Sequence, residues 1–501
     1  MKLPLLLKQT GLRSGAILIV KTIGLVGRIS LTRLVGAEGV GLYQIAYSVF
    51  GLALMALSGG FPTALALFTA KNDERGWLYF KRISIYLFVA AGGLGLAACA
   101  YSGTIARLLG SPDLHTAIRT LAPALLVVPV LGLLRGYLQG QERYALIALS
   151  EIVEQAIRVF SMLLIVVLLL PYGYPAAVGG AMLGTCAGAL LAFAFLTWRI
   201  AGSHNPQAGL ASSPAPPATA GSEMSWLIQT SLAIALTRIL VPFSDFLDAL
   251  IIPNRLQAAG YGVSEAIAVF GVIAGMAAIV VYMPTFVTAA LSHTMTMKMA
   301  ADWKLGRMES FLRRSRIAMD LSWTSGCASG FFLYLFAPEL SRFIFGTAEA
   351  ADPIRYLAAI PLIAGYREMT TSILWAQDRK RTPLVGLAIG IGVAAVIHYT
   401  AIPLPGFGIL GIVAGTIAME MTAVVWNVSS LRLGPFLRRR LPVMAADVVG
   451  LGCIMLIAGH LSEALSVRLP SVIGVLLGML AFGAAAIAFL ALRYIRVWRS
   501  V

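Results

Sequence analysis

The chain has 501 residues, of which 59% are hydrophobic and only 12% are charged, and its formal net charge is +16. A soluble globular domain is roughly half apolar and about a quarter charged, so this composition excludes a water-soluble protein. The positive charge lies in short loops between apolar blocks, without interleaved aromatic residues, which excludes a nucleic-acid partner. An all-α polytopic membrane protein is expected.

Apolar blocks separated by loop-forming residues predict about fourteen transmembrane helices, because about 20 apolar residues cross the hydrocarbon core as a helix. The predicted spans cover 11–34, 42–70, 83–109, 117–139, 146–170, 175–198, 226–251, 264–292, 317–345, 354–376, 383–402, 408–430, 441–462 and 470–494. With this count, 26 lysines and arginines fall on the side of both termini and 7 on the other side. The imbalance predicts that both termini are cytoplasmic, in a bacterial plasma membrane.

The first predicted span carries Lys21 and Arg28 within its apolar stretch and Arg33 near its end. Each cation costs roughly 2.5–3.5 kcal/mol at the centre of a membrane helix. Arg33 is close enough to the interface to reach the headgroups. Lys21 and Arg28 are seven residues apart, so they share one helical face, and we expect them to line a polar cavity.

The fifth predicted span begins with a row formed by Glu151, Glu154 and Arg158. Pairing of Glu154 with Arg158 at i, i+4 would make this row purely structural. Alternatively, the acids are available to a coupling ion or to sugar hydroxyls. Arg158, like Arg367 in the tenth span, is close enough to the interface for snorkelling.

A stretch rich in Pro, Ala, Ser and Gly predicts a flexible cytoplasmic linker over 201–225. It divides an N-terminal lobe of six spans, 1–200, from a C-terminal lobe of six spans, 226–435. Two additional spans occupy 436–501.

The two predicted lobes share a pattern. "VFGLALMALSGGFPT" ends at Pro62-Thr63 and "VFGVIAGMAAIVVYMPT" ends at Pro284-Thr285, and both prolines are expected to kink the chain or to act in gating. In the spans before them, Arg238 and Asp245 repeat the spacing of Lys21 and Arg28. Internal repeats of this kind build many transporters, with the substrate between them.

The charges within the spans suggest a ligand. Lys21, Arg28 and Arg238 give a cavity an excess of positive charge, which favours an anionic group, most naturally a phosphate. Asp245 and Asp248 share a face of the seventh span and, with Glu151 and Glu154, are candidates for contacts to a coupling ion or to sugars. The sequence predicts no metal site or bound cofactor, and it leaves Na⁺, H⁺ and the membrane potential open as driving forces.

Four stretches of the sequence resemble the stage V sporulation protein B family of the multidrug/oligosaccharidyl-lipid/polysaccharide (MOP) exporter superfamily. They are "TRLVGAEGVGLYQIAYSVF" (32–50), "LRGYLQGQERYALIALSEIVEQAIRV" (134–159), "DALIIPNRLQAAGYGVSEAIAVFG" (248–271) and "GFGILGIVAGT" (406–416). The resemblance implies two lobes around a central cavity that opens alternately to either side. It also implies outward movement of lipid-linked saccharides such as lipid II, with cavity arginines required for activity. Arg28 and Arg33 match that pattern, whereas Lys21 stands where an arginine is usual and lacks its bidentate fork.

The leading hypothesis is a flippase or exporter of polyprenyl-pyrophosphate-linked saccharides that performs no covalent chemistry and serves cell-wall, spore-cortex or polysaccharide synthesis. A cation-coupled multidrug exporter on the same fold is the first alternative. A membrane glycosyltransferase or polymerase is less favoured, because the outer loops are short and hold no Asp/His cluster. A structural or assembly role remains open. We expect a monomer in contact with membrane lipid, with cell-wall synthesis proteins as candidate partners.

Overall fold

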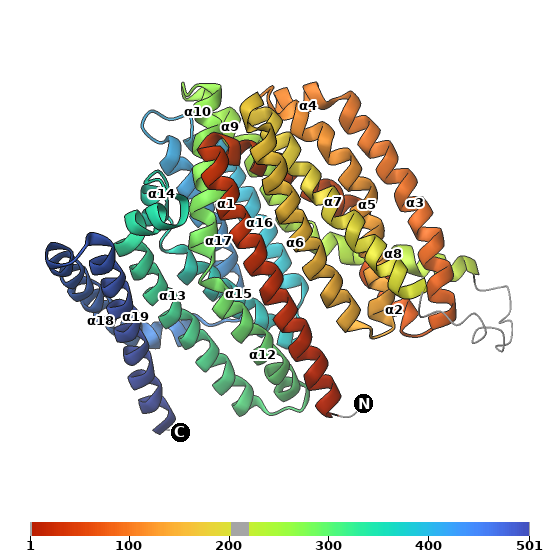
Figure 1. Cartoon of the computed structure of the whole chain (residues 1–501). Helices are drawn as coiled ribbons and strands as arrows, with labels where there is room; N and C mark the ends of the chain where they lie inside the picture. The colour runs from red at the N-terminus through yellow and green to blue at the C-terminus, as the bar shows by residue number, and fades with distance from the viewer. Residues whose placement is uncertain (1–2, 202–219, 500–501) are drawn as a thin grey trace. The chain divides into compact units, whose positions relative to one another are not determined.

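A computed structural model describes residues 3–201 and 220–499, which form helices joined by short turns (Figure 1). No strand occurs within these ranges, so the expected all-α fold is confirmed. The chain divides into two compact units, one ending at Gly271 and the other beginning at Val272. Each unit is described by itself.

The first unit is built mainly from long helices that pack against one another. Its closest pairings join α6 with α7, α7 with α5, and α5 with α3, and α8 packs on α2. The helices are α1 (Leu3–Ser58), α2 (Phe61–Thr69), α3 (Asp73–Ala100), α4 (Ser102–Leu108), α5 (Leu114–Gly140), α6 (Tyr144–Leu169), α7 (Tyr174–Ala201), α8 (Ala220–Arg238), α9 (Leu240–Ala258) and α10 (Val263–Phe270).

Helix α1 consists of two helical segments, because Gly36 has non-helical backbone angles of φ 65° and ψ −168°. A positive φ suits glycine, which has no Cβ to clash with the backbone. A second interruption follows at Gly59-Gly60, and Pro62 then lies in the first turn of α2, where its missing N–H costs no hydrogen bond. The break at Gly36 falls between the first two predicted spans.

Helix α8 belongs to the first unit. Its Leu227 is fully buried in a core cluster with residues of α2, α3, α5 and α7. Near its start, the carboxylate of Glu223 accepts hydrogen bonds from Arg75 at 2.6 Å and from the Tyr79 hydroxyl at 2.9 Å. Of the predicted linker 201–225, residues 202–219 lie outside the described part, and the helix begins at Ala220.

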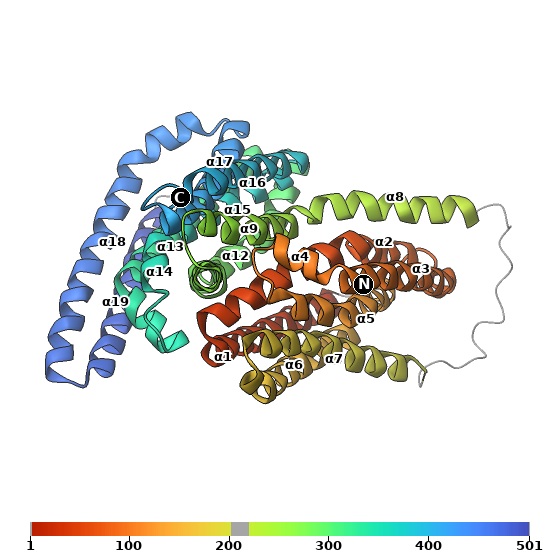
Figure 2. The same ribbon diagram turned by 90° about the horizontal axis from the view of Figure 1, so that it is seen from above.

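The second unit begins within a π-helical turn over Gly271–Ala277. Pro284 immediately precedes α12, so it also stands where a new helix begins. Figure 2 shows α18 and α19 side by side along α13, where Phe332, Phe336 and Phe482 pack in one apolar cluster. The helices are α11 (Ala278–Tyr282), α12 (Thr285–Lys304), α13 (Met308–Phe345), α14 (Ala351–Tyr356), α15 (Ile360–Ala376), α16 (Arg381–Ala401), α17 (Gly408–Ser430), α18 (Gly434–Arg468) and α19 (Ser471–Arg499).

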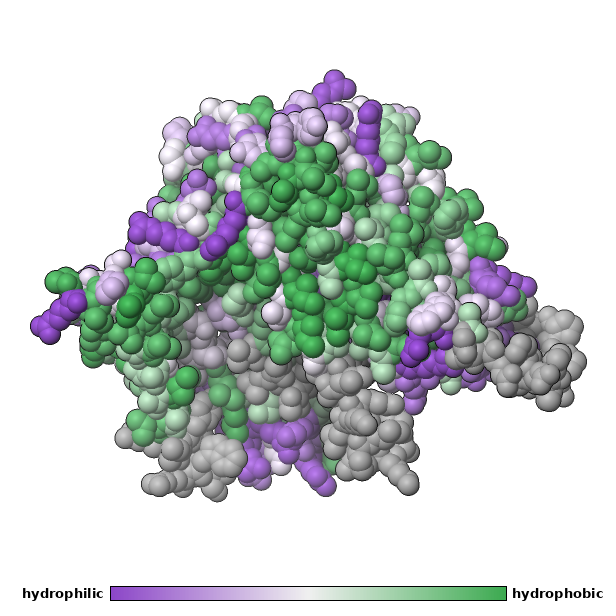
Figure 3. Space-filling view, viewed as in Figure 1, coloured by the Kyte–Doolittle hydropathy of each residue, from purple (hydrophilic) through white to green (hydrophobic). Residues whose placement is uncertain are grey.

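The helices present large apolar side chains outward, as helices in lipid do. Leu96 is 74% exposed, Phe160 is 70% exposed and Ile457 is 68% exposed. Figure 3 shows hydrophobic residues over much of the visible face. Within the described ranges, 10 helical stretches are long and apolar enough to cross a membrane. The chain is therefore a multi-pass membrane protein, and the exact count of fourteen spans stays a prediction.

Candidate functional site

Arg28 is held within the first unit by a neutral partner. It is half-buried on the first segment of α1, and its Nη2 donates a hydrogen bond to Oε1 of Gln44 on the second segment. Its Nε is buried and has no hydrogen-bond partner among the described residues. Lys21 lies two turns earlier on the same segment and is exposed. The break at Gly36 allows Gln44 to meet Arg28, because it lets the chain change direction between them.

Arg158 of α6 reaches the same part of α1. Its guanidinium lies 5.2 Å from the ring centroid of Tyr47 and interacts electrostatically with Tyr43 and Tyr47. The two tyrosine rings are stacked with centroids 5.9 Å apart. Snorkelling of Arg158, which the sequence suggested, did not predict this contact. A signal was present, because Tyr43, Gln44 and Tyr47 place three polar groups on neighbouring positions of one helix.

Glu154 pairs with a residue of another helix instead of with Arg158. Its carboxylate accepts a hydrogen bond from Nη1 of Arg135 on α5 at 2.6 Å, and both side chains are less than one-fifth exposed, at 16% and 17% respectively. Nε of Arg135 also donates to the Ser150 hydroxyl at 3.0 Å. Glu151 is half-buried one turn away. Glu154 and Arg158 therefore do not pair with each other. Glu154 points to α5, and Arg158 points to α1.

The remaining candidates of the first unit lie on α8 and α9. Arg238 is the last residue of α8 and is exposed, directly before the break at Ile239. Asp245 is exposed on α9, and Asp248 one turn later is half-buried. Asp245 interacts electrostatically with both Asp248 and Arg28. The structure therefore brings one predicted acid near one predicted cation.

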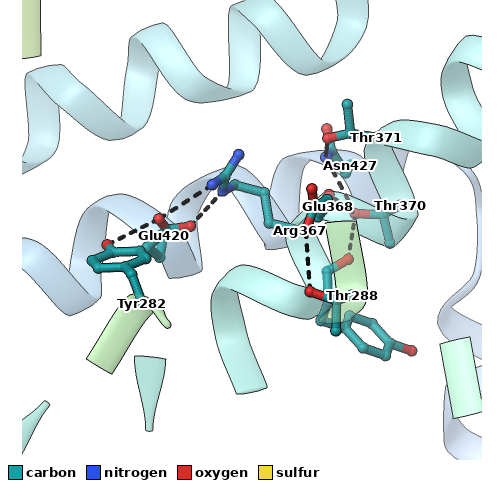
Figure 4. Close-up of polar contacts among 9 residues, drawn as sticks. Tyr282, Thr288, Arg367, Glu368, Thr370, Thr371, Glu420 and Asn427 are labelled. Carbon is teal, nitrogen blue, oxygen red and sulfur yellow. Dashed lines mark hydrogen bonds and ion pairs between the residues drawn. The ribbon is translucent and has the colours of Figure 1, made fainter. Parts of the chain in front are cut away.

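The second unit holds a buried polar cluster that joins α11, α15 and α17. Glu420 of α17 is 2% exposed and forms an ion pair with Arg367 of α15, whose Nη2 lies 3.3 Å from Oε1 (Figure 4). The Tyr282 hydroxyl donates to the same oxygen at 3.2 Å. Arg367 is therefore neutralised by a buried acid, which a snorkelling cation would not need.

Neutral groups continue this cluster along α12, α15 and α17. Thr288 donates to Glu368 at 3.1 Å, and Asn427 donates to the hydroxyls of Thr370 and Thr371 at 3.2 and 3.1 Å (Figure 4). These hydrogen bonds connect α12, α15 and α17, and the bonded residues are far apart in the sequence. Within the part of the chain that the structure describes, no group of three or more His, Cys, Asp or Glu residues is arranged to hold a metal ion.

The sequence of the chain matches a known protein family. A family model described as polysaccharide biosynthesis protein matches residues 6–287. Stage V sporulation protein B of Bacillus subtilis (strain 168) is 28% identical over 418 residues, which cover 81% of this chain and 80% of that protein.

Solved structures show the same fold. The inward closed conformation of the lipid II flippase MurJ matches with a TM-score of 0.71 and 12% identity, over 97% of this chain and 99% of that one. An inward-facing multidrug resistance MATE family transporter of the MOP superfamily matches with a TM-score of 0.64 and 15% identity, over 85% of this chain and 96% of that one. The activities named in these two matches are lipid flipping and transport.

The fold is thus that of polytopic membrane exporters and flippases of the MOP superfamily, as the sequence resemblance predicted. Because the family model covers more than half of its length, the chain belongs to the polysaccharide biosynthesis protein family.

Proposed function

We propose that the protein flips or exports a polyprenyl-pyrophosphate-linked saccharide, such as lipid II or a polysaccharide repeat unit, across the bacterial plasma membrane. One observation carries the proposal. Arg28 lies in a membrane helix, yet its Nη2 donates to the neutral amide of Gln44 and its Nε is buried without a partner among the described residues. An intramembrane cation held in this way keeps its charge for an anionic ligand.

The proposed binding residues for the pyrophosphate are Lys21, Arg28 and Arg238, and the transport is by alternating access without covalent chemistry. Relatives support this substrate class, because the family is one of polysaccharide biosynthesis and a structural neighbour is a lipid II flippase. We further propose that both termini are cytoplasmic, that the protein is a monomer and that Na⁺, H⁺ or the membrane potential drives transport.

The test is a sided flipping assay in proteoliposomes. The full chain is reconstituted and supplied with lipid II or with a glycolipid that is not a peptidoglycan precursor, with and without Na⁺ and H⁺ gradients. We expect flipping of a pyrophosphate-linked lipid, retained in part by Arg28→Lys and lost in Arg28→Ala. Full activity of Arg28→Ala would contradict the role of the cation, and no flipping of either lipid under any gradient would contradict the function.

A cation-coupled multidrug exporter is the second candidate. It is favoured by the exposed carboxylate of Asp245 on α9 and by the structural match to a MATE transporter. In that case, cells that produce the protein would resist cationic dyes, and Asp245→Asn would abolish the resistance. Dye resistance without flipping would favour this second function over the first.

A further inference from the structure

Arg158 is an intramembrane arginine that keeps its charge. Its guanidinium lies 5.2 Å from the ring centroid of Tyr47, which stacks on Tyr43, and both tyrosines are neutral groups. Within the described residues, no carboxylate lies within ion-pair distance of it. Glu154, one turn away on the same helix, is engaged by Arg135 at 2.6 Å.

This arrangement is costly unless a ligand compensates the charge. A cation at the centre of a membrane helix disfavours insertion by roughly 2.5–3.5 kcal/mol when nothing neutralises it. An aromatic ring attracts the guanidinium, but it brings no negative charge. A residue that served only to join helices would be better stabilised by an acid, as Arg135 is.

Close helix packing fixes where Arg158 points. A Cβ added to Gly188 of α7 would lie 2.6 Å from the backbone oxygen of Glu154 and 2.9 Å from Cβ of Arg158, so α7 lies directly against this part of α6. On the other side, a Cβ added to Gly27 of α1 would lie 2.7 Å from a methyl carbon of Val159. Small residues on both neighbours therefore hold the backbone of Arg158, and its guanidinium faces the second segment of α1.

The same short stretch of α1 also serves Arg28. Gln44 accepts a hydrogen bond from Arg28, whereas the ring of Tyr47 lies against the guanidinium of Arg158. Tyr47 interacts electrostatically with both arginines. Among the acids of α6 and α9, Asp245 interacts electrostatically with Arg28, and Glu154 is paired with Arg135.

We propose that Arg158 is a further anion-binding residue, which acts beside Arg28 on the phosphate groups of a lipid. Tyr43 and Tyr47 are positioning residues that orient its guanidinium. A guanidinium can bind two phosphate oxygens at once, and two arginines suit a diphosphate. The inference rests on the proposed function, because it assigns this ligand to the transported lipid. An anionic phospholipid headgroup carries the same chemistry.

The experiment measures lipid binding to the purified full chain in phosphatidylcholine nanodiscs. The probes are undecaprenyl diphosphate, undecaprenol without phosphate, and phosphatidylglycerol. The variants are Arg158→Gln, Arg158→Lys, Arg28→Ala and the double variant Tyr43→Phe with Tyr47→Phe. The matched control removes an intramembrane ion pair of the second unit, Asp447→Asn with Arg493→Gln, which contacts none of these residues. Thermal unfolding of every variant checks that it is folded.

We expect Arg158→Gln to lose about tenfold or more in affinity for undecaprenyl diphosphate, the value of a hydrogen bond to a charged group. Undecaprenol binding should stay unchanged. Arg158→Lys should regain part of the loss, which a purely structural contact to tyrosine would not explain. The double tyrosine variant should lose less than Arg158→Gln, and the control should bind like the wild type.

Three results would overturn the inference, and they differ in meaning. If Arg158→Gln binds the diphosphate normally while Arg28→Ala does not, Arg158 is not a ligand and the proposed function stands. If the wild type binds undecaprenol and its diphosphate equally, the proposed function fails as well. If phosphatidylglycerol competes better than undecaprenyl diphosphate, the site binds membrane lipid instead of the transported lipid.

Discussion

The two units treat their intramembrane arginines differently. In the second unit, Arg367 pairs with the buried carboxylate of Glu420, and Arg440 and Arg493 pair with Asp320 and Asp447. In the first unit, Arg28 is held by the amide of Gln44, and the guanidinium of Arg158 lies against the ring of Tyr47. The first unit also contains an arginine with an acidic partner, because Arg135 is paired with Glu154.

We propose that this difference separates arginines that hold helices together from arginines that bind a ligand. A buried carboxylate cancels the charge of a guanidinium and fixes its position, at the cost of desolvating both groups. A neutral acceptor fixes the position and leaves the charge. On this proposal, the partner of an arginine indicates its role better than the depth of the arginine in a predicted span does.

The largest effect is expected from Glu420→Ala. It leaves Arg367 buried without its acid, and breaking a buried pair typically costs about 3–5 kcal/mol. Thermal unfolding in detergent should show a strong decrease in stability. The double variant Arg367→Met with Glu420→Leu should recover much of the loss. If the single and double variants unfold alike, the pair does not neutralise charge in the way proposed.

The next effect contrasts Arg28→Met with Arg367→Met. Removing Arg28 takes away a cation whose hydrogen-bond partner is the neutral amide of Gln44, so the stability without ligand should not decrease, and flipping should be lost. Removing Arg367 leaves Glu420 unpaired and should destabilise the protein before it affects ligand binding. Equal losses of stability in the two variants would remove the distinction between the units.

Gly188→Ala should have an intermediate effect. The added Cβ would push α7 away from Glu154 and Arg158, and overpacking of this kind costs about 1–3 kcal/mol. Gly93→Ala is the matched control, because a Cβ there meets no atom within 4 Å. Unfolding temperatures of the two variants give the comparison, and equal stability would show that α7 is not tightly packed on α6.

The smallest effect is expected from Lys21→Arg. Lys21 is exposed and the change keeps its charge, so only the bidentate geometry is gained. Exposed charge pairs are worth about 0.2–1 kcal/mol, which limits the change in substrate affinity to about fivefold. Titration with undecaprenyl diphosphate measures it. A much larger gain would show that Lys21 lies closer to the phosphate than its exposure indicates.

The all-α fold was predictable from the sequence, because few other structures contain apolar blocks of about 20 residues. The break at Gly36 was foreseeable from the gap between the first two spans. The prolines at positions 62 and 284 were expected to disturb the chain, and both stand where a new helix begins.

The partners of the charged side chains were not predictable in the same way. The spacing of Glu154 and Arg158 favoured a pair within α6, but the packing of α5 against α6 offered Arg135 instead. Arg367 and Glu420 are 53 residues apart, and no periodicity relates them. Ion pairs between helices depend on which helix faces pack together. The spacing of residues along one helix does not give this packing.

The break at Gly36 also bears on how the chain enters the membrane during its synthesis. The first segment of α1 carries Lys21 and Arg28, which together oppose insertion by roughly 5–7 kcal/mol. Gln44, the partner of Arg28, is sixteen residues further on and leaves the ribosome later. We therefore expect the translocon to release the two segments of α1 into lipid as a pair, with the earlier one retained until the later one arrives.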